Sequence, residues 1–477
     1  MTPRRRQADV APTSMTEDTI FAPSTAPGRA GVAVVRISGP AAGPALMALG
    51  GNILPPARQA VLRAIVDPAD GRVIDRGLVL WFPGPGSFTG QDVGEFHLHG
   101  GRAVVAATLE ALVRLPGLRP AEAGEFTRRA FDNGKLDLSA VEGLADLIDA
   151  DTEAQRRQAL RQMSGGLARL TGGWAARLTR VLAHFEAAID FVEEELPAEL
   201  DRGALVQAGK VAAEITAALD DNHRGERLRE GLSVVILGAP NAGKSSLLNA
   251  LAQRDVAIVS ESAGTTRDIV EVQLDLGGYP VTLADTAGLR ALEVAAAEGR
   301  AAAQAAIERE GMARARERAG LADVTLLLVD LEAALKDAAA LDAVEALLDS
   351  RSILLLNKVD CCDPTKARRL RESLRDWEPI MVSAKTGEGL DAALARLIAR
   401  TGEIFGGSEG AAGITRLRHR RALEDCRDAL KRAQVAELPE LKAEELRLAL
   451  RALGRVTGRV DVEDLLDIVF SEFCIGK

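Results

Sequence analysis

The feature that most constrains the fold of this chain is a glycine-rich segment, Gly238–Ser245, with the sequence Gly-Ala-Pro-Asn-Ala-Gly-Lys-Ser. It follows an apolar run at residues 232–237 and precedes a helical pattern, which is the context that a phosphate-binding loop requires. In such a loop Gly243 lets backbone N–H groups curl around phosphates, Lys244 places a positive charge on the β and γ phosphates, and the Ser245 hydroxyl ligates Mg²⁺. The alternative is an accidental glycine-rich turn, and the flanking strand and helix favour the phosphate-binding loop.

Apolar runs typical of buried strands recur after this loop, at residues 281–285, 324–330 and 353–357, and they alternate with helical segments. Near-continuous apolar strands separated by helices are typical of a parallel sheet that is covered on both faces. We therefore predict a Ras-like, doubly wound α/β domain over residues 231–402.

A second motif, Asp285-Thr286-Ala287-Gly288, lies at the end of one of these strands. From there the Asp285 carboxylate can reach Mg²⁺ through water, and the Gly288 N–H can sense the γ phosphate. The next residue is Leu289, where Ras carries a glutamine that orients the attacking water. Another group must therefore position the water in this chain.

A third motif, Asn357-Lys358-Val-Asp360, follows another strand and selects the base. The Asp360 carboxylate can accept hydrogen bonds from both the N1–H and the 2-amino group of guanine, and adenine offers neither donor. A carboxylate left unpaired by the wrong base would reject ATP, so the expected substrate is GTP. Ser383-Ala384-Lys385 is then expected on the loop that lies against the base.

The segment at residues 260–268 is rich in small residues and is expected to form a switch loop, with Thr266 as its Mg²⁺-binding threonine. The Asn241 oxygen, together with carbonyl groups of this loop, could hold a K⁺ ion where an arginine finger would otherwise place its charge. The alternative, in which Asn241 only stabilises the phosphate-binding loop, stays open.

Short β-type runs broken by glycine and proline dominate the N-terminal part of the chain, at residues 31–38, 78–82 and 93–98. This pattern predicts a compact α+β domain, to which we assign residues 16–132.

Helical periodicity follows from about residue 136 to 229 and returns from about residue 415 to 477. Neither block alone offers a closed core, so the simplest arrangement packs the two together with the nucleotide domain inserted between them. We assign residues 133–230 and 403–477 to the two parts of this helical domain.

The formal net charge of −10 argues against a wholesale coating of the protein by RNA or DNA, because phosphate binding requires clustered Lys and Arg. Any contact with a nucleic acid must be local or shared with a partner. The longest apolar run, at residues 324–329, is far shorter than the roughly 20 residues that span a bilayer. Arg4, Arg5 and Arg6 precede no apolar stretch, so we expect no secretory signal and a cytoplasmic protein. Met1 and Met15 both stay possible starts.

The cysteines show neither a zinc-ligand spacing nor a paired framework, which fits reduced thiols and predicts no disulfide. They are Cys361, Cys362, Cys426 and Cys474.

Further segments, spread from about residue 18 to Lys477, resemble the MnmE (TrmE) family of tRNA modification GTPases. The matching segments are residues 18–22 (Asp-Thr-Ile-Phe-Ala), 27–31 (Pro-Gly-Arg-Ala-Gly), 36–40 (Arg-Ile-Ser-Gly-Pro), 81–90 (Trp-Phe-Pro-Gly-Pro-Gly-Ser-Phe-Thr-Gly), 99–101 (His-Gly-Gly), 124–138, 264–268 (Gly-Thr-Thr-Arg-Asp) and 473–477 (Phe-Cys-Ile-Gly-Lys).

This resemblance implies a GTPase that works with an FAD-dependent partner, MnmG (GidA), in a heterotetramer. Together they would install an aminomethyl or carboxymethylaminomethyl group on C5 of the wobble uridine of certain tRNAs, with a tetrahydrofolate as donor of the one-carbon unit. It also implies a homodimer and a K⁺ ion that stimulates hydrolysis without an arginine finger. Ser260, Ser262 and Thr265 match the family's K⁺-binding positions beside Asn241.

The family's hydrolytic glutamate lies in a Glu-x-x-Gly segment after the switch glycine, and Glu308 in Glu308–Gly311 matches it. The intervening stretch at residues 291–306 is longer here and rich in alanine. A carboxylate at this place could orient the attacking water through a second water molecule. The alternative is an exposed helical glutamate.

In the N-terminal domain the resemblance implies a site for 5-formyl-tetrahydrofolate at Arg36, Glu95, Lys135 and the C-terminal Lys477. A glutamyl carboxylate requires cations, and a pterin edge requires a carboxylate acceptor. Arg36 and Glu95 both lie in β-type runs, so a plain salt bridge between them is the alternative.

The resemblance also implies a functional thiol at Cys474, near the folate; a buried and inert cysteine is the alternative, and both stay open. His97 and His99 alternate on a strand, and we expect them to be structural because no third metal ligand has a suitable spacing.

We expect a large set of residues to contact GTP and its ions. These are Asn241, Ala242, Gly243, Lys244, Ser245, Ser246, Ser260, Glu261, Ser262, Ala263, Gly264, Thr265, Thr266, Asp285, Thr286, Ala287, Gly288, Asn357, Lys358, Asp360, Ser383, Ala384 and Lys385.

Two other functions fit parts of the sequence. A ribosome-assembly or signalling GTPase would be expected to carry a separate RNA-binding module. The basic cluster at residues 416–421 is better explained as one solvated helix face, and contact with tRNA is the alternative. A folate-dependent one-carbon transferase with a merely regulatory nucleotide domain is the second alternative. A requirement for tRNA as acceptor would separate it from a tRNA modification GTPase.

Overall fold

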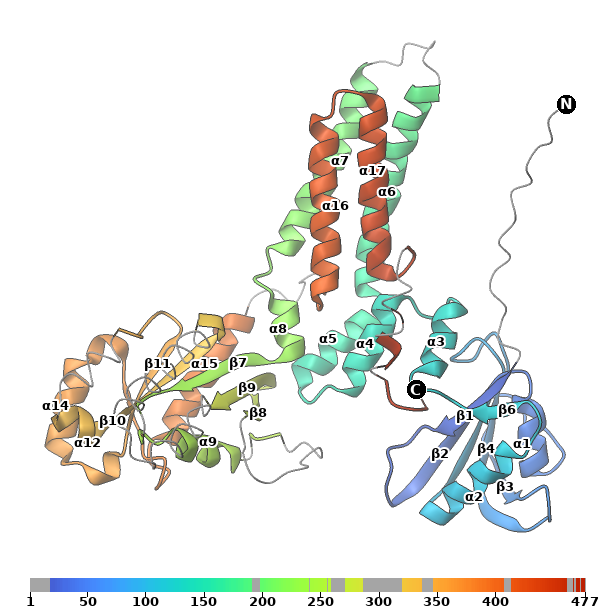
Figure 1. Cartoon of the computed structure of the whole chain (residues 1–477), viewed down its shortest axis with the longest axis horizontal. Helices are drawn as coiled ribbons and strands as arrows, with labels where there is room; N and C mark the ends of the chain where they lie inside the picture. The colour runs from blue at the N-terminus through green and yellow to red at the C-terminus, as the bar shows by residue number, and fades with distance from the viewer. Residues whose placement is uncertain are drawn as a thin grey trace, which may run out of the picture. The chain divides into compact units, whose positions relative to one another are not determined.

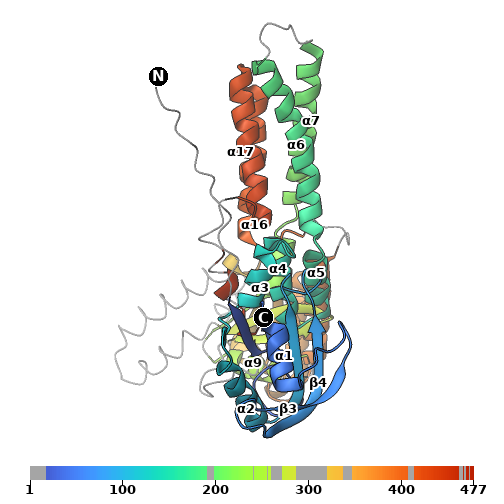
Figure 2. The ribbon, with the colours of Figure 1, turned by 90° about the vertical axis from the view of Figure 1, so that its right-hand side faces the viewer.

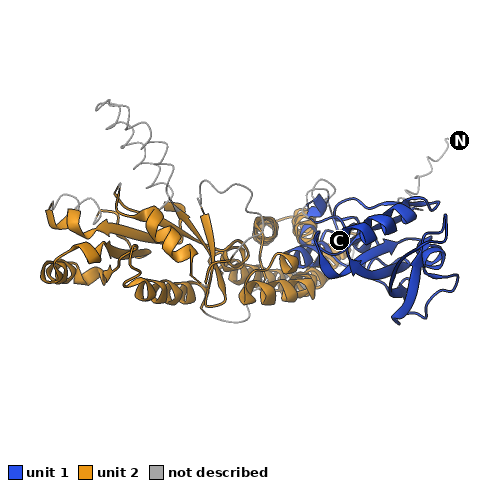
Figure 3. Ribbon diagram, turned by 90° about the horizontal axis from the view of Figure 1, so that it is seen from below, with its two compact units in different colours: residues 1–145, 454–477 blue, residues 146–453 orange. Residues whose placement is uncertain are grey.

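The computed structural model of the 477-residue chain describes residues 18–190, 198–239, 241–254, 256–258, 271–285, 320–336, 346–406, 413–460, 466, 469–471 and 473–476. Its contacts divide the chain into two compact units (Figure 3). The first comprises residues 1–145 and 454–477, and the second comprises residues 146–453.

A six-stranded sheet forms the first unit, with the order β3-β4-β5-β2-β1-β6. Only β1 and β6 pair in parallel. The strands are β1 (Thr19–Pro23), β2 (Ala30–Ser38), β3 (Val61–Val66), β4 (Val73–Phe82), β5 (Val93–Gly100) and β6 (Leu118–Pro120). Helices α1 (Ala42–Gly50) and α2 (Arg102–Val113) share one apolar cluster with the strands, in which Ile37, Phe96 and Leu112 are fully buried. The α+β prediction for this region is confirmed.

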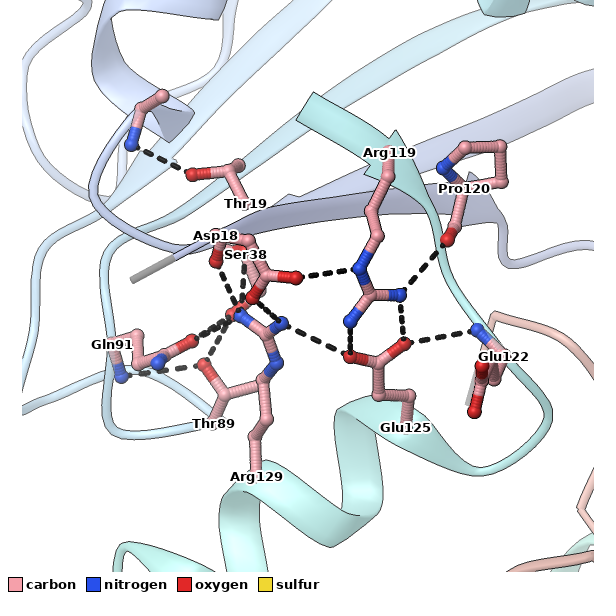
Figure 4. A network of polar contacts seen from close by, with 11 residues as sticks. Asp18, Thr19, Ser38, Thr89, Gln91, Arg119, Pro120, Glu122, Glu125 and Arg129 are labelled. Carbon is pink, nitrogen blue, oxygen red and sulfur yellow. Dashed lines mark hydrogen bonds and ion pairs between the residues drawn. The ribbon is translucent and has the colours of Figure 1, made fainter. Parts of the chain in front are cut away.

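Asp18, the residue that precedes strand β1, is held by a polar network (Figure 4). The Arg129 guanidinium, which is 5% exposed, donates to the Asp18 carboxylate at 2.9 Å and to Glu125 Oε1 at 3.0 Å. Arg119 donates to the same two carboxylates at 2.5 and 2.6 Å. Since Arg129 and Glu125 belong to α3 (Glu125–Asp132), the network ties this helix to the edge of the sheet.

The C-terminal segment packs within the first unit. Val469, Phe470 and Phe473 lie in one apolar cluster with residues of α4 (Leu138–Ile148), and Ile475 forms a β-bridge with Ala123. Gly476 has a φ of +101°, and a Cβ there would lie 2.0 Å from the carbonyl oxygen of Pro23. The sequence prediction assigned residues 133–145 and 454–477 to the helical domain, whereas these contacts group them with the N-terminal sheet.

Long helices form one part of the second unit, where α6 and α7 run beside α16 and α17 (Figures 1 and 2). The helices here are α5 (Glu153–Met163), α6 (Gly166–Asp190), α7 (Ala198–Leu219), α8 (Arg224–Glu230), α16 (Leu417–Val435) and α17 (Pro439–Thr457). Phe185, Ile215, Leu430 and Leu446, one from each long helix, are fully buried. The two helical blocks thus supply one another's core, as predicted.

The basic cluster at residues 416–421 was expected to be one solvated helix face, and this interpretation is wrong. Arg420 is 6% exposed and forms ion pairs with Glu226 at 2.8 Å and Asp221 at 2.6 Å. Arg416 is 12% exposed and lies 2.9 Å from Asp146. These side chains therefore fasten α16 to the base of the bundle.

A second six-stranded sheet completes this unit, with the order β12-β11-β10-β7-β9-β8. Every pair is parallel except β8–β9. The strands are β7 (Leu232–Leu237), β8 (Glu271–Leu276), β9 (Tyr279–Asp285), β10 (Val324–Asp330), β11 (Ser352–Asn357) and β12 (Ile380–Met381). The helices beside them are α9 (Lys244–Ala252), α12 (Leu331–Lys336), α14 (Pro364–Ser373) and α15 (Leu390–Phe405), with short 3-10 turns η2 (Val359–Cys361) and η3 (Arg375–Trp377).

Alternate residues of these strands enter two separate apolar clusters. Val234 and Ile236 pack with α9 and α15, whereas Val235 and Leu237 pack with α12 and α14. Helices therefore cover both faces of the sheet, which confirms the predicted doubly wound domain. Within the described part of the chain, no helix has the length and apolar character needed to cross a bilayer.

Candidate functional site

The glycine-rich loop connects the end of β7 with the start of α9, at the carboxyl edge of the parallel strands. Gly243 adopts a φ of +99°, and Asn241 a φ of +63°. A Cβ at position 243 would lie 2.3 Å from Nδ2 of Asn357, so the loop requires glycine there for both its backbone angle and its close approach. The Lys244 ammonium donates to the carbonyl oxygens of Gly238 at 3.1 Å and Ala239 at 3.0 Å, which holds it against the loop backbone.

Asn357 joins the glycine-rich loop to the third predicted motif. Its side-chain nitrogen donates to the Ala242 carbonyl at 2.7 Å, and its side-chain oxygen accepts from the Ala384 N–H at 3.0 Å. The side chain is 2% exposed, so both hydrogen bonds are shielded from water. Asn357 thereby fixes the position of the predicted phosphate-binding loop relative to the loop that is expected to contact the base.

A pocket of about 470 Å³ opens beside this junction. It is lined by Gly243, Ser246, Asn249, Ala250, Gln253, Asn357, Lys358, Asp360, Cys361, Ser383, Ala384 and Lys385. The sequence predicted that eight of these residues contact GTP: Gly243, Ser246, Asn357, Lys358, Asp360, Ser383, Ala384 and Lys385. A volume of this size accommodates a purine with its ribose.

Asp360 presents its carboxylate at the surface of this pocket in the ionised form. A hydrogen bond from Ser383 lowers the pKa of the Asp360 carboxyl, and the charge of Lys385 lowers it further. An ionised carboxylate only accepts hydrogen bonds, as the guanine N1–H and 2-amino donors require. The geometry is therefore suited to guanine.

Lys358 approaches the pocket from a left-handed backbone conformation, with a φ of +66°. Its ammonium donates to the Asp330 carboxylate at 2.6 Å. Burial alone would raise the pKa of Asp330, but the hydrogen bond from Lys358 and those from the backbone of α12 lower it overall. The ion pair fixes the Lys358 side chain along one wall of the pocket.

Asp285 is the last residue of β9. This strand pairs in parallel with β7, and Asp285 lies opposite Ile236 of β7. Because the carboxyl ends of parallel strands meet at one edge, this places the end of β9 beside the glycine-rich loop. Ser245 is the second residue of α9. The other residues expected to bind GTP or ions lie outside the described residues: Ser260, Glu261, Ser262, Ala263, Gly264, Thr265, Thr266, Thr286, Ala287, Gly288 and the proposed catalytic Glu308.

The residues expected to bind folate belong to the first unit, whereas the residues of the nucleotide pocket belong to the second. Arg36 Nε donates to Glu95 Oε1 at 2.9 Å, so the salt bridge considered from the sequence is present. The other carboxylate oxygen of Glu95 lies 3.0 Å from His97 Nε2. The Arg36 guanidinium also lies 5.7 Å from the ring centre of Phe88.

Lys135 is oriented toward a neighbouring loop, where its ammonium donates to the Pro85 carbonyl at 2.8 Å. Lys477 lies outside the described residues. Cys474 is exposed, so the alternative of a buried, inert cysteine at this position is wrong. The buried cysteine is Cys426, where burial raises the pKa of the thiol to about 12.

His97 and His99 each have a carboxylate partner, Glu95 at 3.0 Å and Asp75 at 2.8 Å. Among the residues that the structure describes, no group of three or more His, Cys, Asp or Glu is placed to hold a metal ion.

Sequence reasoning did not identify several residues of the nucleotide pocket. Asn249, Gln253 and Cys361 line it, and Asp330 holds Lys358. Asp330 carried a usable signal, because it is the last residue of a buried strand that ends at the same sheet edge as the motifs. Asn249 and Gln253 carried none, since polar residues at helical spacing are equally typical of a solvated face.

Comparison with known proteins agrees with this architecture. A family model described as the MnmE helical domain matches residues 138–474, and one described as the GTP-binding protein TrmE N-terminus matches residues 19–135. The tRNA modification GTPase MnmE of Rhodospirillum rubrum is 54% identical over 97% of this chain and all of its own length. That of Parvibaculum lavamentivorans is 53% identical over 96% of this chain and all of its own length.

A mitochondrial relative is almost as similar. A subunit of the 5-taurinomethyluridine tRNA synthase of Rattus norvegicus is 48% identical over 96% of this chain and 93% of its own length. Both family models and the full-length similarity lead to one assignment. The chain belongs to the MnmE family of GTPases.

Proposed function

We propose that this chain hydrolyses GTP as part of the modification of the wobble uridine of certain tRNAs. The observation that carries the proposal is the Asn357 side chain, which joins the phosphate-binding loop to a pocket that ends in the ionised Asp360 carboxylate. The relatives that match nearly the whole chain bear names that combine GTPase activity with tRNA modification. Similarity over the full length supports the transfer of that function to this chain.

In the proposed mechanism the pocket selects and orients GTP. Asp360 accepts the two guanine donors, and Lys385 packs against the base. Lys244 exchanges its carbonyl partners for the β and γ phosphates, because a charge-assisted hydrogen bond to phosphate is stronger than one to a neutral carbonyl. Glu308 is proposed to orient the attacking water, since Leu289 cannot.

The donors expected to hold ions have the chemistry that hard cations prefer, namely hydroxyl, carboxamide and carboxylate oxygens. Ser245 and Thr266 would hold Mg²⁺, with Asp285 reaching it through water. Asn241, Ser260, Ser262 and Thr265 would hold K⁺. When bound, K⁺ would supply positive charge at the developing negative charge between the β and γ phosphates.

The first unit is proposed to bind a tetrahydrofolate that donates the one-carbon unit. Each oxygen of the Glu95 carboxylate has one hydrogen-bond partner in the structure, Arg36 or His97. A carboxylate oxygen can accept more than one hydrogen bond, so Glu95 retains capacity for a pterin N–H. Lys135 and Lys477 would bind the glutamyl carboxylates, and the exposed Cys474 would lie near the folate.

We further propose that the chain acts in the cytoplasm as a homodimer, in a heterotetramer with the FAD-dependent MnmG (GidA). The proposed domains are residues 16–132 for folate and dimerisation, 133–230 and 403–477 for the helical domain, and 231–402 for GTP, where residues 133–145 and 454–477 of the helical domain pack with the first unit. The FAD-dependent partner would supply the redox step.

The test begins with steady-state GTP hydrolysis in KCl and in NaCl at equal ionic strength, for the wild type and for Asn241→Ala. We expect K⁺ to stimulate only the wild type. The second step combines the chain with its FAD-dependent partner, a tetrahydrofolate and an unmodified tRNA, and nucleoside mass spectrometry then detects the modified uridine. Modification that requires hydrolysable GTP supports the proposal. K⁺-independent hydrolysis without any modified uridine would instead favour a plain switch GTPase.

A further inference from the structure

Asp330 does not line the nucleotide pocket, but it holds a residue that does. It is the last residue of β10, and the parallel register places it opposite Asn357, the last residue of β11. Lys358 follows Asn357 directly and lines the pocket. The sheet therefore brings a carboxylate from a neighbouring strand within reach of a lysine in the pocket wall.

The two oxygens of the Asp330 carboxylate have separate partners. Oδ2 accepts from the Lys358 ammonium at 2.6 Å. Oδ1 accepts from two backbone N–H groups in the first turn of α12, those of Glu332 at 3.0 Å and Ala333 at 3.2 Å. Burial alone would raise the pKa of Asp330, but these hydrogen bonds lower it overall, so the carboxyl is ionised. A carboxamide has one acceptor oxygen, so asparagine could keep only one of the two tasks.

Lys358 itself occupies a backbone conformation that does not suit a lysine. Its φ of +66° and ψ of 35° lie in the left-handed region, which glycine and asparagine adopt more readily. Backbone strain of this kind is concentrated at functional sites. The backbone alone would favour another residue type here, so the requirement at this position is for the lysine side chain.

We propose that Asp330 is a positioning residue for guanine-nucleotide binding, which acts through Lys358 and does not itself touch the nucleotide. A lysine side chain that is free in the empty pocket would lose its rotamer freedom when the nucleotide binds. The ion pair orders the Lys358 side chain in advance, so this entropy loss no longer opposes binding. The identification of the ligand as a guanine nucleotide rests on the function proposed above.

The proposal predicts a particular kinetic pattern. Lys358 lines the same pocket as Asp360 and Lys385, the residues expected to contact the base, whereas hydrolysis breaks a bond at the γ phosphate. Loss of the ion pair should therefore weaken the binding of substrate and of transition state alike. Such a loss of uniform binding raises KM and leaves kcat unchanged.

The test measures the affinity of the full chain for a fluorescent GDP analogue, and the kcat and KM of GTP hydrolysis, for Asp330→Asn and Asp330→Ser. Asn and Ser both cap helices well, so each variant keeps the cap of α12 and loses the carboxylate that holds Lys358. The matched control is Glu332→Gln. It removes a carboxylate two residues further along, which is 51% exposed and pairs with Lys336 at 2.6 Å.

We expect both Asp330 variants to bind the analogue about tenfold more weakly, and the KM for GTP to rise by a similar factor. Their kcat should stay within about twofold of the wild type. The control should stay within about twofold in all three quantities. Thermal melting without nucleotide shows that each variant is folded. A merely structural role of Asp330 would lower the melting temperature and the active fraction, and hence kcat, without a change in KM.

A double-mutant cycle then shows whether Asp330 acts through Lys358. Lys358→Met removes the ammonium but keeps an unbranched apolar side chain. In this background Asp330→Asn should weaken GDP binding by less than about twofold, because the ion pair is already absent. An undiminished tenfold effect in that background would overturn the proposal. Unchanged affinity and KM in both Asp330 variants would do the same, as would a lower kcat with an unchanged KM.

Failure of the proposed function is read separately. A wild type that hydrolyses GTP and binds the GDP analogue, but yields no modified uridine, would overturn only the proposed role in tRNA modification. A wild type that binds no guanine nucleotide would overturn the role of Asp330 as well.

Discussion

The side-chain nitrogen of Asn357 donates a hydrogen bond of 2.7 Å to the carbonyl oxygen of Ala242, a residue 115 positions earlier in the chain. The oxygen of the same side chain accepts from the Ala384 N–H at 3.0 Å. One buried carboxamide thus fixes the phosphate-binding loop against the loop that faces the base. A substitution that disturbs this junction should therefore weaken nucleotide binding at both loops.

Gly243→Ala disturbs the junction at its tightest point. The new Cβ would lie 2.3 Å from Asn357 Nδ2, and alanine is strained at a φ of +99°. We expect the affinity for a fluorescent GDP analogue to fall at least about tenfold, which corresponds to about 1.4 kcal/mol. Gly402→Ala is the control, because it lies in α15 with nothing within 4 Å of the added Cβ, and helix propensity predicts a gain of up to about 1 kcal/mol. Equal GDP binding by the wild type and Gly243→Ala would contradict the close approach.

Much of the nucleotide site could be predicted from the sequence, because each motif is contiguous and follows a buried strand. Gly243, Lys358 and Asp360 lie where the strand pattern places them, at one edge of a parallel sheet. The hydrogen bonds of Asn357 could not be predicted, since they join segments 115 and 27 residues apart and leave no periodic signal. Sequence shows which elements end at an edge, but not which side chains meet there.

The cluster at residues 416–421 shows that the burial of charged side chains is equally hard to predict from sequence. Arginines close together in sequence favour an exposed basic face, yet Arg420 pairs with Glu226, 194 residues earlier. Conversely, a second pocket, of about 700 Å³, is lined by Arg157, Arg169 and Arg224 from three separate helices, and no local run of basic residues marks it. Buried ion pairs and concave charged surfaces both depend on tertiary contacts, which composition and spacing do not encode.

Glu226 gives the helical part of the second unit a pH-dependent stability. Burial alone would raise the pKa of Glu226, but the hydrogen bond and charge of Arg420 lower it overall. A lowered pKa in the folded state stabilises the protein above the unfolded value of about 4.3 and loses this effect as the pH falls through the folded value. At pH 7 we expect Glu226→Gln to cost about 3 kcal/mol, because it leaves a buried guanidinium without its main partner.

Urea denaturation, followed by helical circular dichroism at pH 7 and pH 3, measures this effect. The difference between the wild type and Glu226→Gln should shrink as the pH falls. Glu230→Gln is the control, since Glu230 is 68% exposed and its removal should change stability by less than about 0.5 kcal/mol. If the wild type and Glu226→Gln differ in unfolding free energy by the same amount at both pH values, the ionised carboxylate is not what stabilises the bundle.

Arg129 should be equally important for the first unit (Figure 4). Its guanidinium, only 5% exposed, pairs with Asp18 and Glu125 and also donates to the Ser38 carbonyl at 3.3 Å. Arg129→Met would leave Glu125 with Arg119 alone, so we expect a loss of about 3 kcal/mol in unfolding free energy. Arg72→Met, at a side chain that is 84% exposed, should have almost no effect. Denaturation curves that coincide for the two variants would refute the role assigned to Arg129.

The most direct test of the account measures nucleotide specificity, because the central claim is that the pocket ending in Asp360 selects guanine. Steady-state hydrolysis of GTP, ATP and XTP is compared for the wild type, Asp360→Asn and the control Asp363→Asn, which retains the helix cap that Asp363 provides to α14. The account predicts that Asp360→Asn loses about 100-fold or more in kcat/KM for GTP and gains XTP, whose 2-oxo group and N1 pair with a carboxamide, while the control is unchanged. Undiminished GTP hydrolysis by Asp360→Asn, with no gain for XTP, would contradict it.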